Sequence, residues 1–245
     1  MKNLVEVKDL KKSYGLKEAV RGISFKIKDN EILGLLGPNG SGKTTTIGMM
    51  LGLLKPSNGE IIIDGKKIED NRIEILKKIN FISPYIELPK KLTVKQNLIV
   101  YGKLYSVPDI KKRIEYLSEK LRLEDLLNRI TGELSSGQKN RVSLAKALIN
   151  NPKVLLLDEP TASLDPEIAD FVRTFLENYK KEKKISILLA SHNMNEVTRL
   201  CKSILMMKDG IIIDSGSPEE LINKHGRQNL EEVFLKLSRS KNEFN

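Results

Sequence analysis

The residues with the clearest chemical potential form the stretch Gly37–Thr44, which reads Gly-Pro-Asn-Gly-Ser-Gly-Lys-Thr and directly follows the apolar run Ile32–Leu36. In the spacing G-x-x-x-x-G-K-[ST], glycines let backbone N–H groups turn toward phosphate oxygens, and the following helix presents its positive N-terminal end. The spacing predicts that Lys43 reaches the β- and γ-phosphates of a nucleoside triphosphate and that the Thr44 hydroxyl binds Mg²⁺. The alternative is a flexible glycine-rich turn, which the strand before it and the helical stretch Thr45–Leu54 after it disfavour. The expected phosphate-binding residues are Gly37, Pro38, Asn39, Gly40, Ser41, Gly42, Lys43, Thr44 and Thr45.

Two carboxylates follow a second apolar run. Val154–Leu157 has the composition of a buried strand, and Asp158 and Glu159 come directly after it. A carboxylate at a strand tip can hold Mg²⁺ through the water shell of the ion, so we expect Asp158 to share the metal with Thr44. Glu159 is the candidate base that polarises the water attacking the γ-phosphate. Together with the phosphate loop, this pair predicts a nucleoside triphosphatase.

A third motif, about twenty residues before Asp158, narrows the class. Leu134-Ser135-Ser136-Gly137-Gln138 opens a helical stretch over Lys139–Leu148. The pentapeptide resembles the Leu-Ser-Gly-Gly-Gln signature of the ATP-binding cassette (ABC) family, with Ser136 in place of the first glycine. Ser135 is a hydroxyl donor, and Gly137 allows close approach at a helix N-terminus, which suits a γ-phosphate. Taken alone, the pentapeptide is better explained as an ordinary serine N-cap.

Three further positions fall in the order that this family shows. The resemblance implies that Tyr14 stacks on the adenine of ATP and that His192 contacts the γ-phosphate. It implies that Ser163-Leu164-Asp165 is a loop at a dimer contact, although Asp165-Pro166 is also typical of a helix N-cap followed by proline. The alternative is that Tyr14, in a surface turn, and His192, at a strand end, are ordinary surface residues without a role in binding. The catalytic residues that the resemblance implies are Lys43, Glu159 and His192. It adds Ser135, Gly137 and Gln138 to the ATP-binding residues. The ligands that it implies are ATP and Mg²⁺.

One position departs from the family pattern. A glutamine that helps the metal site and contacts the membrane partner is expected within Phe81–Glu87, and Pro84 stands about where it would fall. A proline side chain cannot bind a metal. Three alternatives stay open: Tyr85 or Glu87 substitutes, water completes the metal shell, or the loop only couples to the partner.

The elements that position these residues follow from hydrophobic spacing. Runs typical of strands occupy Leu4–Val7, Ala19–Ile27, Ile32–Leu36, Val154–Leu157 and Ile185–Leu189. Helical spacing extends over Val94–Tyr105, Ile110–Leu127, Pro166–Tyr179 and the amphipathic tail Leu230–Leu237. Asp64-Gly65 and Asp209-Gly210 stand beside isoleucine-rich runs and predict tight hairpin turns, because both central positions of such turns need positive φ.

The resemblance covers nearly the whole chain and implies an α/β fold. We expect a P-loop NTPase core with a mixed sheet, an N-terminal antiparallel β subdomain and a helical subdomain that carries the signature motif. The expected boundaries give one domain over residues 1–245, with the nucleotide-binding core in 1–85 and 150–225. The helical subdomain then occupies 86–149, and a C-terminal helix occupies 226–245.

Composition limits the alternatives. The 245 residues carry 42 Lys+Arg against 32 Asp+Glu, for a net charge of +10, and include a single cysteine, Cys201. No apolar run approaches the length of about 20 residues that a spanning helix needs, and the lone cysteine favours a reducing cytosol and a place in the core. The positive charge suits a nucleic-acid binder, but a lysine-rich solvated surface explains it equally well, and we expect no nucleic-acid partner.

The single set of motifs has consequences for assembly. In this family the signature helix of one subunit completes the ATP site of another, so the resemblance implies a head-to-tail homodimer, or a pair with a paralogous ATPase. It also implies transmembrane permease subunits and a peripheral position on the cytoplasmic face of the cell membrane. Ser217–Leu221 and Asn229–Leu235 resemble the C-termini of ATPases that serve type-two exporters. The transported substrate is not specified by this chain.

Two other classes of protein fit the sequence less well than a transport ATPase. A soluble ABC-type ATPase acting on DNA or ribosomes would suit the basic charge, but such proteins generally insert long coiled coils or carry two cassettes, which 245 residues do not accommodate. A P-loop kinase would lack the signature helix and would need an acceptor pocket, for which the sequence offers no residues.

Overall fold

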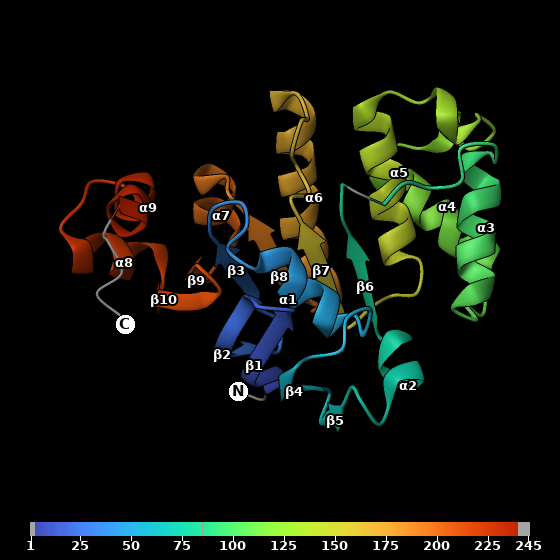
Figure 1. Ribbon diagram of the computed structural model, residues 1–245. Coiled ribbons are helices and arrows are strands. Elements are labelled where there is room, and N and C mark those ends of the chain that lie inside the picture. Colours follow the sequence, from blue (N-terminus) through green and yellow to red (C-terminus); the bar gives the residue numbers. More distant parts are fainter. Residues whose placement is uncertain (1–2, 85, 240–245) are drawn as a thin grey trace. The chain divides into compact units, whose positions relative to one another are not determined.

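Residues 3–84 and 86–239 are described by the computed structural model (Figure 1). The chain divides into two compact units. The first comprises residues 1–75 and 186–245, and the second comprises residues 76–185. The expected boundaries at 85/86, 149/150 and 225/226 stay a prediction.

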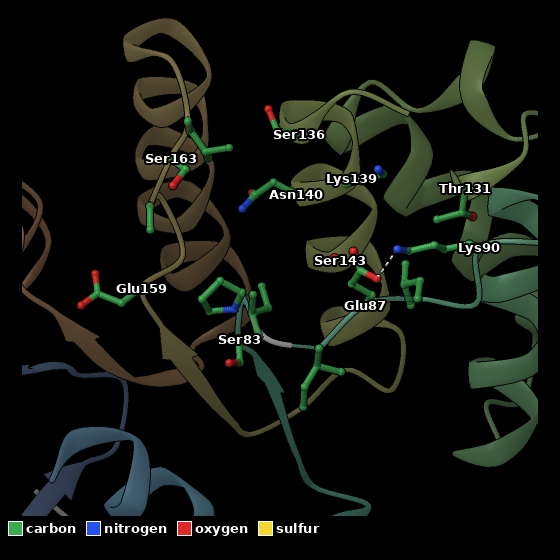
Figure 2. A pocket seen from close by; sticks show the side chains of 16 residues that line it. Ser83, Glu87, Lys90, Thr131, Ser136, Lys139, Asn140, Ser143, Glu159 and Ser163 are labelled. Atoms are coloured by element: carbon green, nitrogen blue, oxygen red, sulfur yellow. Dashed lines mark ion pairs between the residues drawn. The ribbon is translucent and has the colours of Figure 1, made fainter. Parts of the chain in front are cut away.

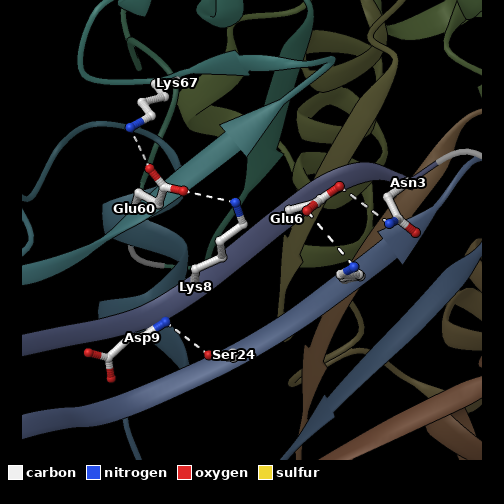
Figure 3. Close-up of polar contacts among 8 residues, drawn as sticks. Asn3, Glu6, Lys8, Asp9, Ser24, Glu60 and Lys67 are labelled. Atoms are coloured by element: carbon white, nitrogen blue, oxygen red, sulfur yellow. Dashed lines mark hydrogen bonds and ion pairs between the residues drawn. The ribbon is translucent and has the colours of Figure 1, made fainter.

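An antiparallel sheet occupies the N-terminal part of the first unit. Its strands are β1 (Asn3–Tyr14), β2 (Lys17–Lys28), β4 (Asn58–Ile63) and β5 (Lys66–Lys67), in the order β2-β1-β4-β5. Val5 and Val7 alternate with polar residues and are buried. On this sheet the Glu60 carboxylate lies between Lys8, at 2.9 Å, and Lys67, at 2.6 Å (Figure 3). Hydrogen bonds from these two ammonium groups lower the pKa of Glu60.

The first unit also contains a mixed set of four strands in the order β10-β9-β3-β8. They are β3 (Ile32–Leu36), β8 (Ser186–Ser191), β9 (Ser203–Lys208) and β10 (Ile211–Gly216). Strand β3 pairs in parallel with β8 and with β9, and β10 pairs antiparallel with β9. Every residue of β3 and β8 is buried, which explains why both read as runs without polar alternation.

Both predicted hairpin turns are confirmed. Asp64 and Gly65 have φ of 52° and 78° and join β4 to β5, where Ile63 pairs with Lys66. Asp209 and Gly210 have φ of 47° and 80° and join β9 to β10. Positive φ at both central positions matches the twist of the flanking strands.

The helices of the first unit are short and mostly capped. They are α1 (Lys43–Met50), α2 (Arg72–Leu76, whose last residue belongs to the second unit), α7 (Met194–Leu200), α8 (Pro218–His225) and α9 (Leu230–Arg239). Ser217 caps α8 through a capping box with Glu220. In α9, Leu230 and Val233 are buried, so the predicted amphipathic tail is confirmed over the described residues.

The second unit combines two parallel strands with a set of helices. Strands β6 (Ile79–Ile82) and β7 (Val154–Asp158) pair in parallel. The helices are α3 (Val94–Leu104), α4 (Ile110–Leu121), α5 (Ser136–Leu148) and α6 (Pro166–Lys183), with 3₁₀ helices η1 (Glu124–Leu126) and η2 (Thr131–Glu133). Helices α3 and α5 carry capping boxes, and aspartates cap α4 and α6.

One predicted helix is shorter than expected. The helical spacing over Ile110–Leu127 breaks after Leu121, because Arg122 adopts φ of 53° and ends α4 in a left-handed conformation. The N–H of Leu123 then donates to the carbonyl of Ser118 at 2.8 Å. The apolar pattern continues because η1 buries Leu126. Among residues 3–84 and 86–239, no helix combines the length and the apolar composition that a membrane span requires.

Candidate nucleotide-binding and catalytic site

The predicted site residues divide between the two units. The first unit holds Tyr14, the phosphate loop and His192, and the second holds the signature motif with Asp158 and Glu159. Within the first unit, the phosphate loop leaves β3 after Leu36 and leads into α1. The Lys43 side chain is only 6% exposed, and its ammonium donates to the carbonyl oxygens of Gly37, at 2.7 Å, and Pro38, at 3.1 Å. Charged phosphate oxygens accept stronger hydrogen bonds than neutral carbonyls do, so this buried ammonium is suited to bind a phosphate group.

The phosphate loop is braced by its neighbours in the first unit. Gly42 has φ of 107°, and a Cβ built there would lie 2.6 Å from the Ala19 carbonyl oxygen and 2.7 Å from Cε of Met207. Only glycine fits this position. The Gly210 N–H donates to the Ser41 carbonyl at 3.1 Å. Strands β2 and β9 and the turn after β9 therefore fix the loop conformation.

The loop offers hydrogen-bond donors that suit a polyphosphate. Asn39, Gly40 and Thr44 are exposed. The Ser41 hydroxyl is buried and has no hydrogen-bond partner among the residues that the structure describes. A buried donor without a partner is costly unless a ligand satisfies it, and a phosphate oxygen would do so. The loop residues therefore fit the expected nucleotide.

The predicted switch histidine leaves the sheet beside the phosphate loop. Strands β3 and β8 are parallel neighbours, and Leu36 is in register with Ser191. Because Gly37 and His192 are the next residues, both follow the carboxyl ends of adjacent strands. His192 is exposed. The structure therefore brings His192 and the phosphate loop to one edge of the first unit's sheet, where ligands of α/β folds bind.

Tyr14 is the last residue of β1, and 49% of its surface is exposed. The Lys12 ammonium lies 5.2 Å from the centroid of its ring. A tyrosine at this exposure retains surface for stacking on a base, and the nearby ammonium gives this surface a positive charge.

The two carboxylates of the second unit have different surroundings. Asp158 ends β7 and is 2% exposed. Glu159 is partly exposed and adopts φ of 50°, a left-handed conformation that non-glycine residues seldom adopt. A carboxylate and a hydroxyl oxygen are ligands that Mg²⁺ prefers, so Asp158 and Thr44 fit the expected ion by chemistry. No group of three or more His, Cys, Asp or Glu in the described ranges is arranged to hold a metal. Mg²⁺ commonly binds with one or two carboxylates plus phosphates and water.

The signature motif forms the start of α5. Ser135 is the N-cap: its hydroxyl oxygen accepts the Gln138 N–H at 3.3 Å, and the Gln138 side-chain oxygen accepts the Ser135 N–H at 3.0 Å. The capping interpretation is thus confirmed. Accepting a bond leaves the hydroxyl hydrogen of the exposed Ser135 for a second partner. Gly137 is buried, and a Cβ there would lie 3.2 Å from Cγ1 of Ile168 in α6, so its small size serves helix packing.

A cavity of about 210 Å³ in the second unit adjoins the signature helix (Figure 2). Four parts of the second unit line it. Glu159 and Ser163 come from the loop after β7, and Ser136, Lys139, Asn140 and Ser143 come from α5. Segment 83–90 and η2 supply the other side chains that Figure 2 labels. Pro84 lines the cavity and Tyr85 lies outside the described residues. Glu87 pairs with Lys90 at 2.7 Å, and this hydrogen bond lowers the pKa of Glu87. The replacement for the family glutamine stays open.

Two minor predictions are confirmed. The Asp165 carboxylate caps α6 by accepting the Ile168 N–H at 2.9 Å, with Pro166 in the first turn. Cys201 is buried in the core of the first unit, and burial together with the charge of Glu196 raises the pKa of its thiol.

The buried Glu196 was not predicted from the sequence. The pattern Asn193-x-x-Glu196, a helix-start signature, was its only signal.

Comparison with known proteins agrees with this geometry. Residues 20–162 match the family described as ABC transporter. The chain is 38% identical to the ABC transporter ATP-binding protein NatA of Bacillus subtilis (strain 168), over 89% of each protein. It is 37% identical to the Nod factor export ATP-binding protein I of Rhizobium sp. (strain N33), over 94% of this chain and 76% of that one.

A solved structure gives the same answer. It is the dimeric post-hydrolysis state of the ATP-binding cassette MJ0796 bound to ADP and Pi, which superposes with a TM-score of 0.80 at 28% identity. The match covers 87% of this chain and 98% of that one. The α/β architecture is thus that of an ABC ATPase cassette. The chain belongs to the ABC transporter family, in which it is an ATP-binding subunit and an ATPase.

Proposed function

We propose that the chain powers export. Two copies, or one copy and a paralogous ATPase, would close head to tail around two Mg-ATP and drive separate membrane subunits. The observation that carries this proposal is the start of α5. Ser135 is exposed, its conformation is fixed by a capping box, and its hydroxyl hydrogen is left for a partner. The dimeric cassette MJ0796 supports the pairing, because it is a relative of the same fold that forms a dimer.

Each residue then has a physical role in phosphoryl transfer. The N–H groups of Gly37–Thr45 and the Lys43 ammonium would hold the phosphates, and Tyr14 would stack on the adenine. The serine and backbone N–H groups of Ser135–Gln138 from the opposite copy would add donors to the γ-phosphate. Preorganised donors of this kind stabilise the charge that develops on the transferred phosphoryl group.

Hydrolysis needs a base and a contact that senses the γ-phosphate. Glu159 would accept the proton of the attacking water, and His192 would contact the γ-phosphate. Thr44 and Asp158 would hold Mg²⁺, which would neutralise negative charge on the phosphates. Loss of the γ-phosphate would remove the Ser135 and His192 contacts and allow the pair to open.

The names of the relatives support the proposed direction of transport. The Rhizobium relative is named for export, which favours export here. We propose that the chain lies on the cytoplasmic face of the membrane, as a peripheral subunit that contacts permease subunits through the loop Pro84–Glu87 and the helical subdomain of residues 86–149. The loop around Pro84 would then couple to the partner rather than to the metal.

The decisive experiment is sedimentation velocity of the Glu159→Gln variant with Mg-ATP. We expect this variant to bind ATP, to hydrolyse it at least 100-fold more slowly, and to sediment as a dimer. Glu167→Gln makes the same charge change at an exposed position in the first turn of α6 and should behave as the unmodified chain. Adding Ser135→Asn, which retains a good N-cap but lacks the hydroxyl, should abolish the dimer.

Two results would contradict the proposal. Rapid turnover by Glu159→Gln would exclude that residue as the base. A monomer at saturating Mg-ATP, with or without the membrane partners, would exclude the head-to-tail pair.

A further inference from the structure

A closed ring of hydrogen bonds surrounds the backbone at His192. The Ser191 hydroxyl donates to Oε2 of Glu196 at 2.8 Å and accepts the Asn193 N–H at 3.0 Å. The Asn193 side-chain oxygen in turn accepts the Glu196 N–H at 3.2 Å and caps α7. The residues on both sides of His192 are therefore fixed, while the His192 side chain is exposed.

Two members of this ring, Ser191 and Glu196, lie in the core, where polar groups are costly. Ser191 is 0% exposed and Glu196 is 1% exposed. A buried carboxylate is disfavoured unless hydrogen bonds compensate its lost hydration. An apolar side chain at the start of α7 would avoid that cost. The proposed function uses neither Ser191 nor Glu196, so their burial needs another explanation.

Packing of α7 on β3 fixes where the carboxylate lies. A Cβ at Gly34 would lie 3.0 Å from Sγ of Cys201 and 3.1 Å from Cγ1 of Val197. The glycine in β3 therefore permits α7 to approach the strand closely. Glu196 precedes Val197, so this approach brings its carboxylate to Ser191 at the end of β8.

The ring is also in register with the phosphate loop. Leu36, the residue before the loop, pairs with Ser191 across adjacent parallel strands. A shift of the chain at Ser191 would consequently displace His192 relative to Gly37. Because the strand pairing holds Ser191 and the ring holds Asn193, the intervening residue has little backbone freedom.

We propose that Ser191 and Glu196 are positioning residues for His192. They fix the backbone from which the histidine reaches the γ-phosphate, and they make no contact with ATP. The inference rests on the proposed role of His192 and adds two residues to it. Their contribution is to catalysis in the closed state, because misplacing a reacting group by about 1 Å can cost on the order of 100-fold in rate.

The test measures kcat and KM for Mg-ATP with the full chain. Ser191→Ala should lower kcat about tenfold and leave KM within about twofold, since the phosphate loop is unchanged. Ser191→Thr retains the hydroxyl and should restore most of kcat. Glu196→Met should reproduce the loss and add nothing further when combined with Ser191→Ala.

A matched control separates positioning from stability. Ser186 stands at the other end of β8, is equally buried, accepts the Asn30 N–H at 2.9 Å and donates to the Lys28 carbonyl at 3.0 Å. Ser186→Ala likewise removes a buried hydroxyl and its two hydrogen bonds, so its melting temperature should fall as that of Ser191→Ala does. Its kcat should not change.

Measuring the Ser191→Ala effect in a His192→Ala variant tests whether Ser191 acts through His192. If Ser191 acts through His192, then Ser191→Ala should cost nothing more in that background. An additional tenfold loss there, or an unchanged kcat in Ser191→Ala alone, would overturn the inference while leaving the role of His192 intact. An unchanged kcat in His192→Ala alone would instead overturn the proposed role of His192, and the inference with it.

Discussion

Lys146 carries a buried positive charge, and its removal should change how stability depends on pH. The residue lies in α5 and is 7% exposed. Its ammonium donates to the Phe81 carbonyl at 3.0 Å and lies 4.6 Å from the Phe81 ring centroid and 5.6 Å from that of Tyr101. These contacts offset part of the lost hydration. Burial nevertheless lowers the pKa of Lys146 from 10.5 to about 8.

The magnitude and sign follow from that pKa. At about 1.4 kcal/mol per pKa unit, burial disfavours the ammonium by about 3 kcal/mol. Below pH 8 both folded and unfolded chains are protonated at Lys146, and the full cost is present. Between pH 8 and 10.5 the folded chain has released this proton while the unfolded chain retains it, so the free energy of unfolding rises with pH. Above pH 10.5 both forms are neutral and the change is complete.

The assay is urea unfolding followed by circular dichroism, at several pH values from 7 to 10.5, for the unmodified chain and for Lys146→Met. We expect the stability of the unmodified chain relative to Lys146→Met to increase by about 3 kcal/mol over this range. Lys95→Met, which removes an exposed lysine from α3, controls for the loss of a lysine as such. A stability difference between Lys146→Met and the unmodified chain that stays constant from pH 7 to 10.5 would refute this reasoning.

Two further predictions concern packing. Gly137→Ala should lower the free energy of unfolding by about 1 kcal/mol, because the new methyl group would crowd Ile168 at 3.2 Å and this outweighs the better helix propensity of alanine. Thermal unfolding checks this, and adding Ile168→Val should recover part of the loss; full stability of the single variant would contradict it. The Cys201 thiol should not react with Ellman's reagent in the native chain and should react once urea unfolds it, because it is buried and its pKa is raised. Fast labelling without urea would show that the core opens there.

The features that the sequence predicted well are those set by neighbouring residues. The positive φ of Asp64-Gly65 and Asp209-Gly210 depends on residue types within the turns themselves. Strand β3 begins and ends where the apolar run Ile32–Leu36 does. The phosphate loop belongs to this class only in part: its glycines between a strand and a helix are recognisable in the sequence, but its conformation also depends on contacts with Ala19, Met207 and Gly210.

Features set by distant contacts were not predictable in the same way. The end of α4 depends on Arg122, a residue without the usual preference for a left-handed conformation. Lys146 occupies a helical position where sequence alone indicates a solvated lysine, and it is buried because Phe81 and Tyr101 come from other elements. The carboxylate of Glu196 likewise acquires its surroundings only when α7 packs on β3.

The backbone at Glu159 bears on the proposed base independently of any resemblance. Glu159 has φ of 50°, a backbone conformation that glycine adopts without strain. Holding a non-glycine residue in this region costs on the order of 1 kcal/mol, and such strain clusters at functional sites. The residue before it, Asp158, completes a buried strand, so the left-handed turn at Glu159 directs the two consecutive carboxylates into different environments, one 2% exposed and one at a cavity. If position 159 served only to form a turn after β7, glycine there would make the folded chain more stable than glutamate does. A carboxylate in a strained backbone conformation at this cavity supports the proposed assignment of Glu159, rather than Asp158, as the group that meets the attacking water.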